Sequence, residues 1–377
     1  MTDVNSFLVD GAVFEIPWTG IAKATLALYE GCLKLNPKLQ ITVIHRRPLV
    51  CPLPPNLHSI RWGRSLPRRI WRQVAVPFYT AKHSLDVLHF PWNGGMPALV
   101  GRSKALKVMT LHDVLPFSIP DYFPDVQAEI NYRTQLQHDL EQADLVITDS
   151  YFSQGNITSE FRVAQEPVVV YPTALLRQDS QEDVVNPLVQ QPYFLYCGGY
   201  DRRKGIELLV ETFLKLWRAG NLKVPLYLVG QAHPISPQFS QNLEEAIQLG
   251  GVQEIGYVSD AALTGFYRHA LALVYPSRYE GFGLPPLEAM GLGCPVITYR
   301  LSSLPEVCGE AALYLDPDDE GSLSGAILKL ASDELLRAEL AAKGLKQAAR
   351  FCARNSAETF LKALDQVVGH KANSKQL

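Results

Sequence analysis

The sequence predicts an α/β protein of two domains, each a doubly wound parallel β-sheet with helices on both faces. Three observations favour this fold class. The chain has 377 residues, more than one hydrophobic core usually holds, which indicates about two domains. Short apolar runs alternate with longer amphipathic runs, as in repeated βαβ units. Residues 174–191, rich in Gln, Asp, Asn and Pro, interrupt this alternation and predict a linker.

The first βαβ series lies in residues 1–173, the predicted N-terminal domain. Its short apolar runs are expected to form strands, and the longer amphipathic runs between them are expected to form helices. Strands are predicted at 6–14, 41–46, 86–91, 106–112, 144–149 and 167–171, and helices at 20–34, 67–82, 124–142 and 151–161.

The second series lies in residues 192–354, and the tail after residue 333, rich in Ala, Leu, Lys and Glu, is expected to be helical. Sheets of this kind bind ligands beyond the carboxyl ends of their strands. With two sheets facing each other, the site is expected in the cleft between the domains. Strands are predicted at 193–197, 225–229, 252–258, 271–275, 295–299 and 311–315, and helices at 204–219, 237–249, 259–269, 285–292 and 322–332.

The composition is that of a globular protein, with 47% hydrophobic and 19% charged residues. A net charge of −3 gives no bulk attraction to nucleic acid, so no nucleic-acid partner is expected. The six cysteines lie far apart without a CxxC pair, which indicates reduced core residues in a cytoplasmic protein rather than disulfides or a zinc site. Neither a secretion signal nor an apolar run of about 20 residues is found.

Basic residues concentrate between positions 46 and 107, where eleven Lys and Arg accompany a single acid, Asp86. Such a stretch is either a solvated face or a surface for an anionic acceptor or an acidic membrane leaflet. The second interpretation would place the protein peripherally on the inner face of the membrane.

The most informative stretch reads EGFGLPPLEAM over residues 280–290. Its consecutive prolines suit the first turn of a helix, where a missing N–H costs least. The N–H groups of Gly283 and Leu284 would then point outward from a helix amino end, which is a natural anion site. The carboxylates of Glu280 and Glu288 make sense beside it if each binds a diol. The alternative is that both only complement the helix dipole.

A second stretch, GGYDRRKG over residues 198–205, follows the first strand of the second series and opens a helix. It offers flexible backbone and adjacent cations at a helix start, which suits a diphosphate. It is not a GxGxxG motif, so dinucleotide binding is not indicated. The alternative is a basic solvated turn.

The spacing of Glu280 and Glu288, followed by GCPVI at 293–297, resembles the signature of glycosyltransferase family 4. The resemblance is strong over about 193–316, weak before about 105, and covers nearly the whole chain. It implies the GT-B fold, with two Rossmann-like domains facing across a cleft. It also implies retaining transfer of a hexose from a nucleotide-diphosphate sugar to a saccharide or lipid-linked acceptor. The last helix, about 355–370, is expected to cross back onto the N-terminal, acceptor-side domain.

The resemblance implies a role for each matched residue of the second domain. Arg203 and Lys204 match the pair that neutralises the leaving nucleoside diphosphate. Glu280 and the backbone N–H groups beside it would bind the donor sugar, and Glu288 the ribose. The other donor-side candidates are Gly199, Tyr257, Val258, Phe282, Gly283 and Leu284.

In the first domain, the sequence HDVLP begins at His112, at the end of a predicted strand. It resembles the HDxxP motif of a family subset that includes many mannosyltransferases, where the His lies against the donor sugar. Asp113 would fix the ring or bind acceptor, while a purely structural His is the alternative. The segment 148–150 resembles the one closing the family's N-terminal sheet and is expected to be structural.

The loop around Gly20 resembles the family's N-terminal glycine loop, which approaches the donor diphosphate and acceptor. This sequence departs from the usual form, since Ala22 stands where a further glycine is expected. Trp18 in the same loop is a candidate acceptor contact.

Neither a metal nor another cofactor is expected. The acidic segment 316–319 contains Pro and follows a predicted strand, which indicates a turn. GDP-mannose is the first expectation for the donor and a UDP-hexose the next. Two alternatives remain: another GT-B enzyme, such as a nucleotide-sugar epimerase or a phosphorylase, or an inert nucleotide-sugar-binding protein. An epimerase would change the donor without any acceptor.

Overall fold

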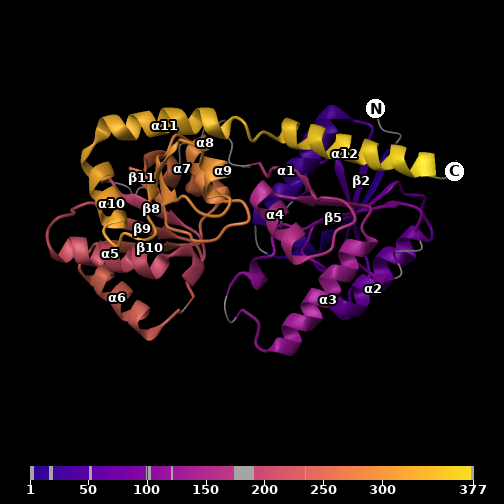
Figure 1. Ribbon diagram of the computed structural model, residues 1–377, viewed down its shortest axis with the longest axis horizontal. Helices are drawn as coiled ribbons and strands as arrows, with labels where there is room; N and C mark the ends of the chain where they lie inside the picture. The colour runs from indigo at the N-terminus through magenta and orange to yellow at the C-terminus, as the bar shows by residue number, and fades with distance from the viewer. Residues whose placement is uncertain are drawn as a thin grey trace. The chain divides into compact units, whose positions relative to one another are not determined.

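The computed structural model describes residues 4–16, 20–50, 53–98, 100, 103–119, 122–173, 191–233 and 235–374. The chain divides into two compact units (Figure 1). Unit 1 is Met1–Thr173 together with Phe351–Leu377, and unit 2 is Ala174–Arg350. Of the predicted linker, only Gln191 lies within the described residues.

Unit 1 contains a seven-stranded parallel sheet with helices packed against it (Figure 1). Its strands are β1 (Ser6–Asp10), β2 (Gln40–His45), β3 (Leu57–Arg61), β4 (Val87–Phe90), β5 (Leu106–Thr110), β6 (Leu145–Thr148) and β7 (Val168–Val169). Its α-helices are α1 (Gly20–Leu35), α2 (Arg68–Thr80), α3 (Val126–Gln142), α4 (Tyr151–Glu160) and α12 (Ala353–Ser374), with short 3₁₀ helices at Gly11–Glu15 and Leu115–Phe117.

The strand order of unit 1 is β3-β2-β1-β4-β5-β6-β7. The order reverses between β1 and β4, which is where a doubly wound sheet opens a crevice at its carboxyl edge. The last helix of the chain, α12, packs against α1. The two helices approach so closely that a Cβ at Gly31 would lie 2.3 Å from the carbonyl oxygen of Ala353.

Unit 2 contains a six-stranded parallel sheet in the order β10-β9-β8-β11-β12-β13. Its strands are β8 (Phe194–Cys197), β9 (Leu226–Val229), β10 (Val252–Gly256), β11 (Ala272–Tyr275), β12 (Val296–Tyr299) and β13 (Ala312–Leu315). Its helices are the 3₁₀ helix η4 (Arg202–Lys204), α5 (Ile206–Arg218), α6 (Pro237–Gln248), α7 (Asp260–His269), α8 (Leu284–Gly291), α9 (Leu304–Cys308), α10 (Ser322–Ser332) and α11 (Glu334–Ala348).

The predicted elements differ from the structure where local hydrogen bonds end a strand or delay a helix. The first strand stops at Asp10, because its carboxylate accepts a hydrogen bond from the Ala12 N–H at 3.0 Å and starts a 3₁₀ helix. The helix expected from residue 204 begins at Ile206, since Gly205 adopts a left-handed conformation after η4. Strand β3 was not predicted, because its sequence LHSIR is mostly exposed and carries little apolar signal.

Two observations bear on membranes and on cysteines. In the described ranges, no helix combines the length and the apolar character needed to cross a bilayer. Five cysteines lie in those ranges, and all five are free thiols. Cys51 lies outside them.

Replacing Gly205 with Ala is expected to destabilise unit 2, because the new Cβ would lie 2.3 Å from the carbonyl oxygen of Pro276. Gly220 is a matched control, since its φ of 70° resembles the 69° of Gly205 but no atom lies within 4 Å of its Cβ position. We expect Gly220→Ala to cost about 1 kcal/mol from the backbone alone. Gly205→Ala should cost about 1–3 kcal/mol more from the clash. Urea unfolding measures both, and equal losses would contradict this close packing.

Candidate functional site

The fold of unit 2 brings two loops together at the carboxyl edge of its sheet. Strands β8 and β11 are neighbours in the sheet, although β9 and β10 lie between them in sequence. The loop 198–205 follows β8, and the loop 276–283 follows β11. The two loops are joined by the hydrogen bond from the Arg278 N–H to the carbonyl oxygen of Arg203 at 2.8 Å. This is the point of strand-order reversal where such sheets bind ligands.

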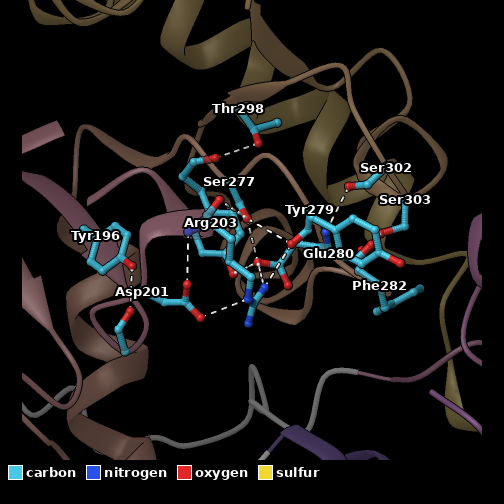
Figure 2. A network of polar contacts seen from close by, with 12 residues as sticks. Tyr196, Asp201, Arg203, Ser277, Tyr279, Glu280, Phe282, Thr298, Ser302 and Ser303 are labelled. Carbon is cyan, nitrogen blue, oxygen red and sulfur yellow. Dashed lines mark hydrogen bonds and ion pairs between the residues drawn. The ribbon is translucent and has the colours of Figure 1, made fainter. Parts of the chain in front are cut away.

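The guanidinium of Arg203 is held from both loops. Asp201 caps η4 by accepting the Arg203 N–H at 3.0 Å, and its other carboxylate oxygen accepts the Nε–H of the same side chain at 3.0 Å. Nη1 donates to the carbonyl oxygen of Tyr279 at 2.9 Å and lies 3.2 Å from Oε1 of Glu280 (Figure 2). These contacts fix a cation that is only partly buried.

The carboxylate of Glu280 is anchored through one of its two oxygens (Figure 2). Oε1 accepts hydrogen bonds from the Tyr275 hydroxyl at 2.7 Å, the Ser277 hydroxyl at 2.8 Å and Nη1 of Arg203 at 3.2 Å. Among the described residues, Oε2 forms no hydrogen bond. Burial, and next the charge of Glu280, raise the pKa of Tyr275 well above its usual value, so its hydroxyl stays a donor. The arrangement leaves Oε2 available to accept from a ligand.

The backbone of the Glu280 loop is fixed by two serines that follow β12. The Ser302 hydroxyl accepts the Glu280 N–H at 3.0 Å. The Ser303 hydroxyl lies 2.8 Å from the carbonyl oxygen of Glu280 and 2.7 Å from that of Phe282. Ser302 has a φ of 53°, the only positive φ of a non-glycine residue within the described ranges. Such a conformation costs about 1–2 kcal/mol, and strained backbone of this kind concentrates at functional sites.

Helix α8 starts directly after this loop, as the two prolines predict. Gly283 caps it with a φ of 108°, and Leu284 is its first residue. Glu288 lies within the helix and is buried, with 6% of its surface exposed. The Tyr267 hydroxyl donates to its carboxylate at 3.3 Å. A buried carboxylate needs hydrogen-bond partners, and this one lies one helix turn beyond the amino end of α8.

Within the described residues, the Lys204 ammonium takes no part in the contacts between Arg203 and Glu280. This ammonium lies 5.8 Å from the centre of the Tyr275 ring and would be 3.1 Å from a Cβ at Gly198. In the described part of the chain, it forms no ion pair. The side chain of its neighbour Arg202 forms an ion pair with Glu207, with Nε 3.5 Å from Oε2. Lys204 is therefore a cation with no internal carboxylate to neutralise it.

The remaining donor-side candidates lie on loops at the same edge of the sheet. The carbonyl oxygen of Gly199 accepts a hydrogen bond from the Tyr196 hydroxyl at 2.9 Å. Tyr257 and Val258 follow β10, and the Tyr257 side chain is exposed. Ser259 caps α7 by accepting the Ala262 N–H at 3.3 Å.

In unit 1, His112 contacts a residue that the sequence analysis took as structural. Its Nδ1 lies 2.8 Å from Oδ2 of Asp149. Its backbone N–H donates to Asn93 at 2.8 Å. Asp113, expected to fix the ring or bind acceptor, accepts the Leu115 N–H at 3.2 Å. The partner Asp149 follows the strand next to that of His112, a clue that only the strand order provides.

The electrostatics of His112 combine opposing effects. Burial alone lowers the pKa of the ring, but the carboxylate of Asp149, the charge of Asp113 and the carbonyl of Pro91 outweigh it, and the net pKa is raised. His89, also fully buried, behaves oppositely, since burial lowers its pKa to about 3. Gly20 begins α1, whereas Trp18 lies outside the described residues.

The acidic segment 316–319 forms a turn, as its sequence predicts. The Asp316 carboxylate accepts the Asp318 N–H at 3.0 Å, and the Asp319 carboxylate accepts the Gly321 N–H at 2.8 Å. Over the residues whose structure is described, no group of three or more His, Cys, Asp or Glu side chains is arranged to hold a metal ion.

Solved structures with the same fold are glycosyltransferases of the GT-B class. Sucrose-phosphate synthase from Thermosynechococcus elongatus aligns with a TM-score of 0.77 and 22% identity, covering 97% of this chain and all of that one. Anabaena HepE, solved in complex with UDP and glucose, aligns with a TM-score of 0.72 and 16% identity, covering 96% and 100%. The predicted fold class is confirmed.

Sequence comparisons identify the family. A model of the group 1 glycosyl transferases matches residues 178–347. O-antigen chain mannosyltransferase B of Escherichia coli is 34% identical over 257 residues, 66% of this chain and 67% of that protein. O-antigen chain mannosyltransferase RfbU of Salmonella typhimurium is 30% identical over 221 residues, 59% of this chain and 60% of that protein. The chain belongs to the group 1 glycosyl transferases, and it is a glycosyltransferase, as predicted.

The Tyr275 hydroxyl is expected to matter for turnover because it anchors Glu280. Tyr275→Phe should lower kcat/KM by about 10- to 150-fold, the equivalent of one hydrogen bond to a charged group. Tyr193→Phe is the control, since it removes an equally buried hydroxyl that donates at 2.7 Å to a neutral carbonyl of Phe266. Steady-state assays of both variants decide the point, and similar kinetics for the two would remove Tyr275 from the site.

Proposed function

We propose that this chain is a retaining hexosyltransferase that uses a nucleotide-diphosphate sugar and acts in polysaccharide biosynthesis. The observation that carries the proposal is the anchored Arg203–Glu280 pair, with the unpaired Lys204 beside it. The acceptor would be a saccharide or a lipid-linked saccharide. Unit 2 would bind the donor, and unit 1 would supply the acceptor side.

The leaving group of such a reaction is a nucleoside diphosphate, so charge on its oxygens must be stabilised as the bond to the sugar breaks. Lys204 suits this role because no carboxylate of the described ranges pairs with it. Arg203 would add a second cation, although Asp201 and Glu280 already hold part of its charge. The N–H groups at Gly283 and Leu284 begin α8, where a helix favours anions.

The sugar and the ribose would be held by the two glutamates. Oε2 of Glu280 is free to accept from a hexose hydroxyl, while Oε1 keeps the carboxylate fixed. Glu288 would bind the ribose, and the backbone near Tyr257 and Val258 the base. Gly199, Phe282 and Gly20 would complete the donor contacts.

The anchoring of Glu280 also bears on mechanism. An oxygen that accepts from Tyr275, Ser277 and Arg203 has its lone pairs engaged and is a weak nucleophile. A covalent sugar–enzyme intermediate through Oε1 is therefore disfavoured, and in the proposed complex Oε2 accepts from a hexose hydroxyl instead. Departure of the diphosphate on the same face as acceptor attack, with the charge stabilised electrostatically, fits these contacts better.

Mannose is the hexose we propose first, with GDP-mannose as donor and UDP-hexoses next. Two relatives carry the name of mannosyltransferase. The resemblance of the segment beginning at His112 to the HDxxP motif supports the same choice. The complex of HepE contains UDP and glucose instead, which keeps UDP-sugars in the test panel.

Lys204→Ala is expected to lower donor turnover by about 10- to 150-fold, since one charge-assisted contact to the diphosphate is lost. Lys215→Ala is the control, because that exposed lysine lies on α5 and pairs with Glu211 on its own helix. Thermal-shift measurements with GDP-mannose and UDP-hexoses should show stabilisation of wild type and less of Lys204→Ala. A donor altered in the absence of acceptor would instead indicate an epimerase, and binding without transfer an inert protein.

We also propose that unit 1 contacts an anionic membrane surface through α2. Ile70, Val74 and Phe78, spaced four residues apart, expose 51%, 40% and 44% of their surfaces along one side of this helix. The Trp62 ring stacks on Phe78 at 5.3 Å, and the Lys82 ammonium lies 4.2 Å from the Phe78 ring. An apolar stripe with a lysine at its end suits the interface of an acidic bilayer.

Several basic residues of the stretch 46–107 make internal contacts and are not available to a membrane. Arg72 pairs with Asp10 at 3.1 Å, and Lys107 pairs with Asp144 at 3.2 Å, so both serve internal contacts. Arg46 donates to the carbonyl oxygen of Leu66. Lys82, just after α2, lies over the Phe78 ring and remains as a cation beside the apolar stripe.

Phe78→Glu is expected to reduce sedimentation with vesicles containing phosphatidylserine by about tenfold, since it replaces apolar contact with like charge. Leu335→Glu is the control, because Leu335 is 85% exposed on α11 in unit 2. Equal binding of the two variants to the vesicles, or no binding of the wild-type protein at low salt, would remove the membrane proposal. Either result would leave the transferase proposal intact.

A further inference from the structure

His112 and Asp149 meet because of the register of two neighbouring strands. β5 and β6 pair in parallel, with Thr110 opposite Ile147. Two residues further along, His112 and Asp149 leave the same edge of the sheet, and Nδ1 lies 2.8 Å from Oδ2. Both side chains are at least 85% buried.

The chemistry of the contact determines the state of the ring. An ionised carboxylate can only accept a hydrogen bond. In the contact with Asp149, Nδ1 of His112 is therefore the donor and carries the hydrogen. Nε2 is then the ring nitrogen that remains for another partner. It is buried and forms no hydrogen bond of ordinary geometry with the residues that the structure describes, although the Pro91 carbonyl favours the protonated ring. A buried polar atom without a partner is costly and calls for one.

His89, on the adjacent strand β4, provides an internal contrast. Its Nδ1 contacts the Tyr29 hydroxyl, and its Nε2 lies 2.7 Å from the Thr110 hydroxyl. Both ring nitrogens are satisfied by neutral groups, and its low pKa keeps this ring uncharged. Unlike His89, His112 has a carboxylate at Nδ1 and, within the described residues, an unsatisfied Nε2.

We propose that Asp149 is a positioning residue of the transfer reaction, which holds the His112 imidazole by Nδ1 and thereby presents Nε2 to the hexose. The inference rests on the proposed function and on the resemblance of HDVLP, which begins at His112, to the HDxxP motif, in which the His lies against the donor sugar. Asp149 itself touches no substrate. Its part is to fix the ring orientation and to favour the imidazolium, whose Nε2–H donates to a sugar hydroxyl.

The charged and titratable groups around the ring favour this state together. Asp149 and Asp113 both raise the pKa of His112, while the neutral His89 adds no charge. Because the pKa is raised, the ring keeps its Nε2 proton to higher pH and loses it as the pH rises through that value. An activity that needs the Nε2–H therefore falls on the alkaline side, and weakening the pair moves this fall to lower pH.

Asp149→Asn tests the proposal, because it keeps the size of the side chain and removes its charge. We expect the pKa of His112, followed by ¹⁵N NMR of the ring, to fall by about 1 unit or more, as loss of a paired charge implies. The alkaline fall of kcat should move by the same amount, and kcat should fall about tenfold or more while the KM for donor changes less.

Asp144→Asn is the matched control. Asp144 precedes β6 at the opposite edge of the sheet, where it binds the Lys107 N–H at 2.9 Å and Lys371 at 2.9 Å. Its loss should lower stability and leave both the His112 titration and the pH profile of kcat unchanged. A His112 titration and pH profile that are equally unmoved in Asp149→Asn would overturn the proposal.

If Asp149→Asn does not fold, a ¹⁵N NMR measurement on the wild-type protein still tests the proposal. Its ¹⁵N spectrum should show His112 protonated on Nδ1, with a pKa above the usual 6.5. A ring protonated only on Nε2, with a pKa below that value, would overturn the pairing. This readout needs no turnover, so failure of the transferase proposal, seen as no transfer from any donor, remains distinguishable from failure of the Asp149 proposal.

Discussion

The hydrogen bonds between the loops after β8 and β11 are the constraint on which the rest of the candidate donor site depends. They join Arg203, from one side of the strand-order reversal, to Glu280, from the other. Gly205 lets the backbones approach, since any Cβ there would meet Pro276. With the two loops fixed to each other, Lys204 and the start of α8 acquire fixed places along the same edge of the sheet.

The anchored pair also explains how charge is divided within the site. Arg203 has two carboxylate partners, whereas Lys204 has none in the described part of the chain. In the proposed site, the first cation would mainly orient Glu280, and the second would meet an anionic ligand. Ser302, which follows β12, fixes the Glu280 backbone by accepting its N–H, and to do so it adopts a left-handed backbone conformation. A strained residue beside an ionised side chain is what a preorganised site requires, because its groups need not move when charge develops.

The sequence alone predicted the fold, and it named Arg203, Lys204 and Glu280 as donor-site candidates, because both depend on local patterns. Alternating apolar and amphipathic runs located nearly all the strands and helices, and the prolines after Gly283 located the start of α8. What it missed depends on contacts between distant segments. The pairing of Asp149 with His112 needs the order of β5 and β6, and the anchoring of Glu280 by Tyr275 needs side-chain geometry. The left-handed backbone at Ser302 could not be predicted either, because the usual sequence signal for that conformation is a glycine.

The most direct test of the account is a crystal structure of the protein with GDP-mannose. The account predicts pyrophosphate oxygens within hydrogen-bond distance of Lys204 and of the N–H groups at the start of α8, with Oε2 of Glu280 accepting from a hexose hydroxyl. Glu280 should keep its contacts to Tyr275, Ser277 and Arg203. A nucleotide bound away from these groups, or a hexose that makes no contact with Glu280, would contradict it.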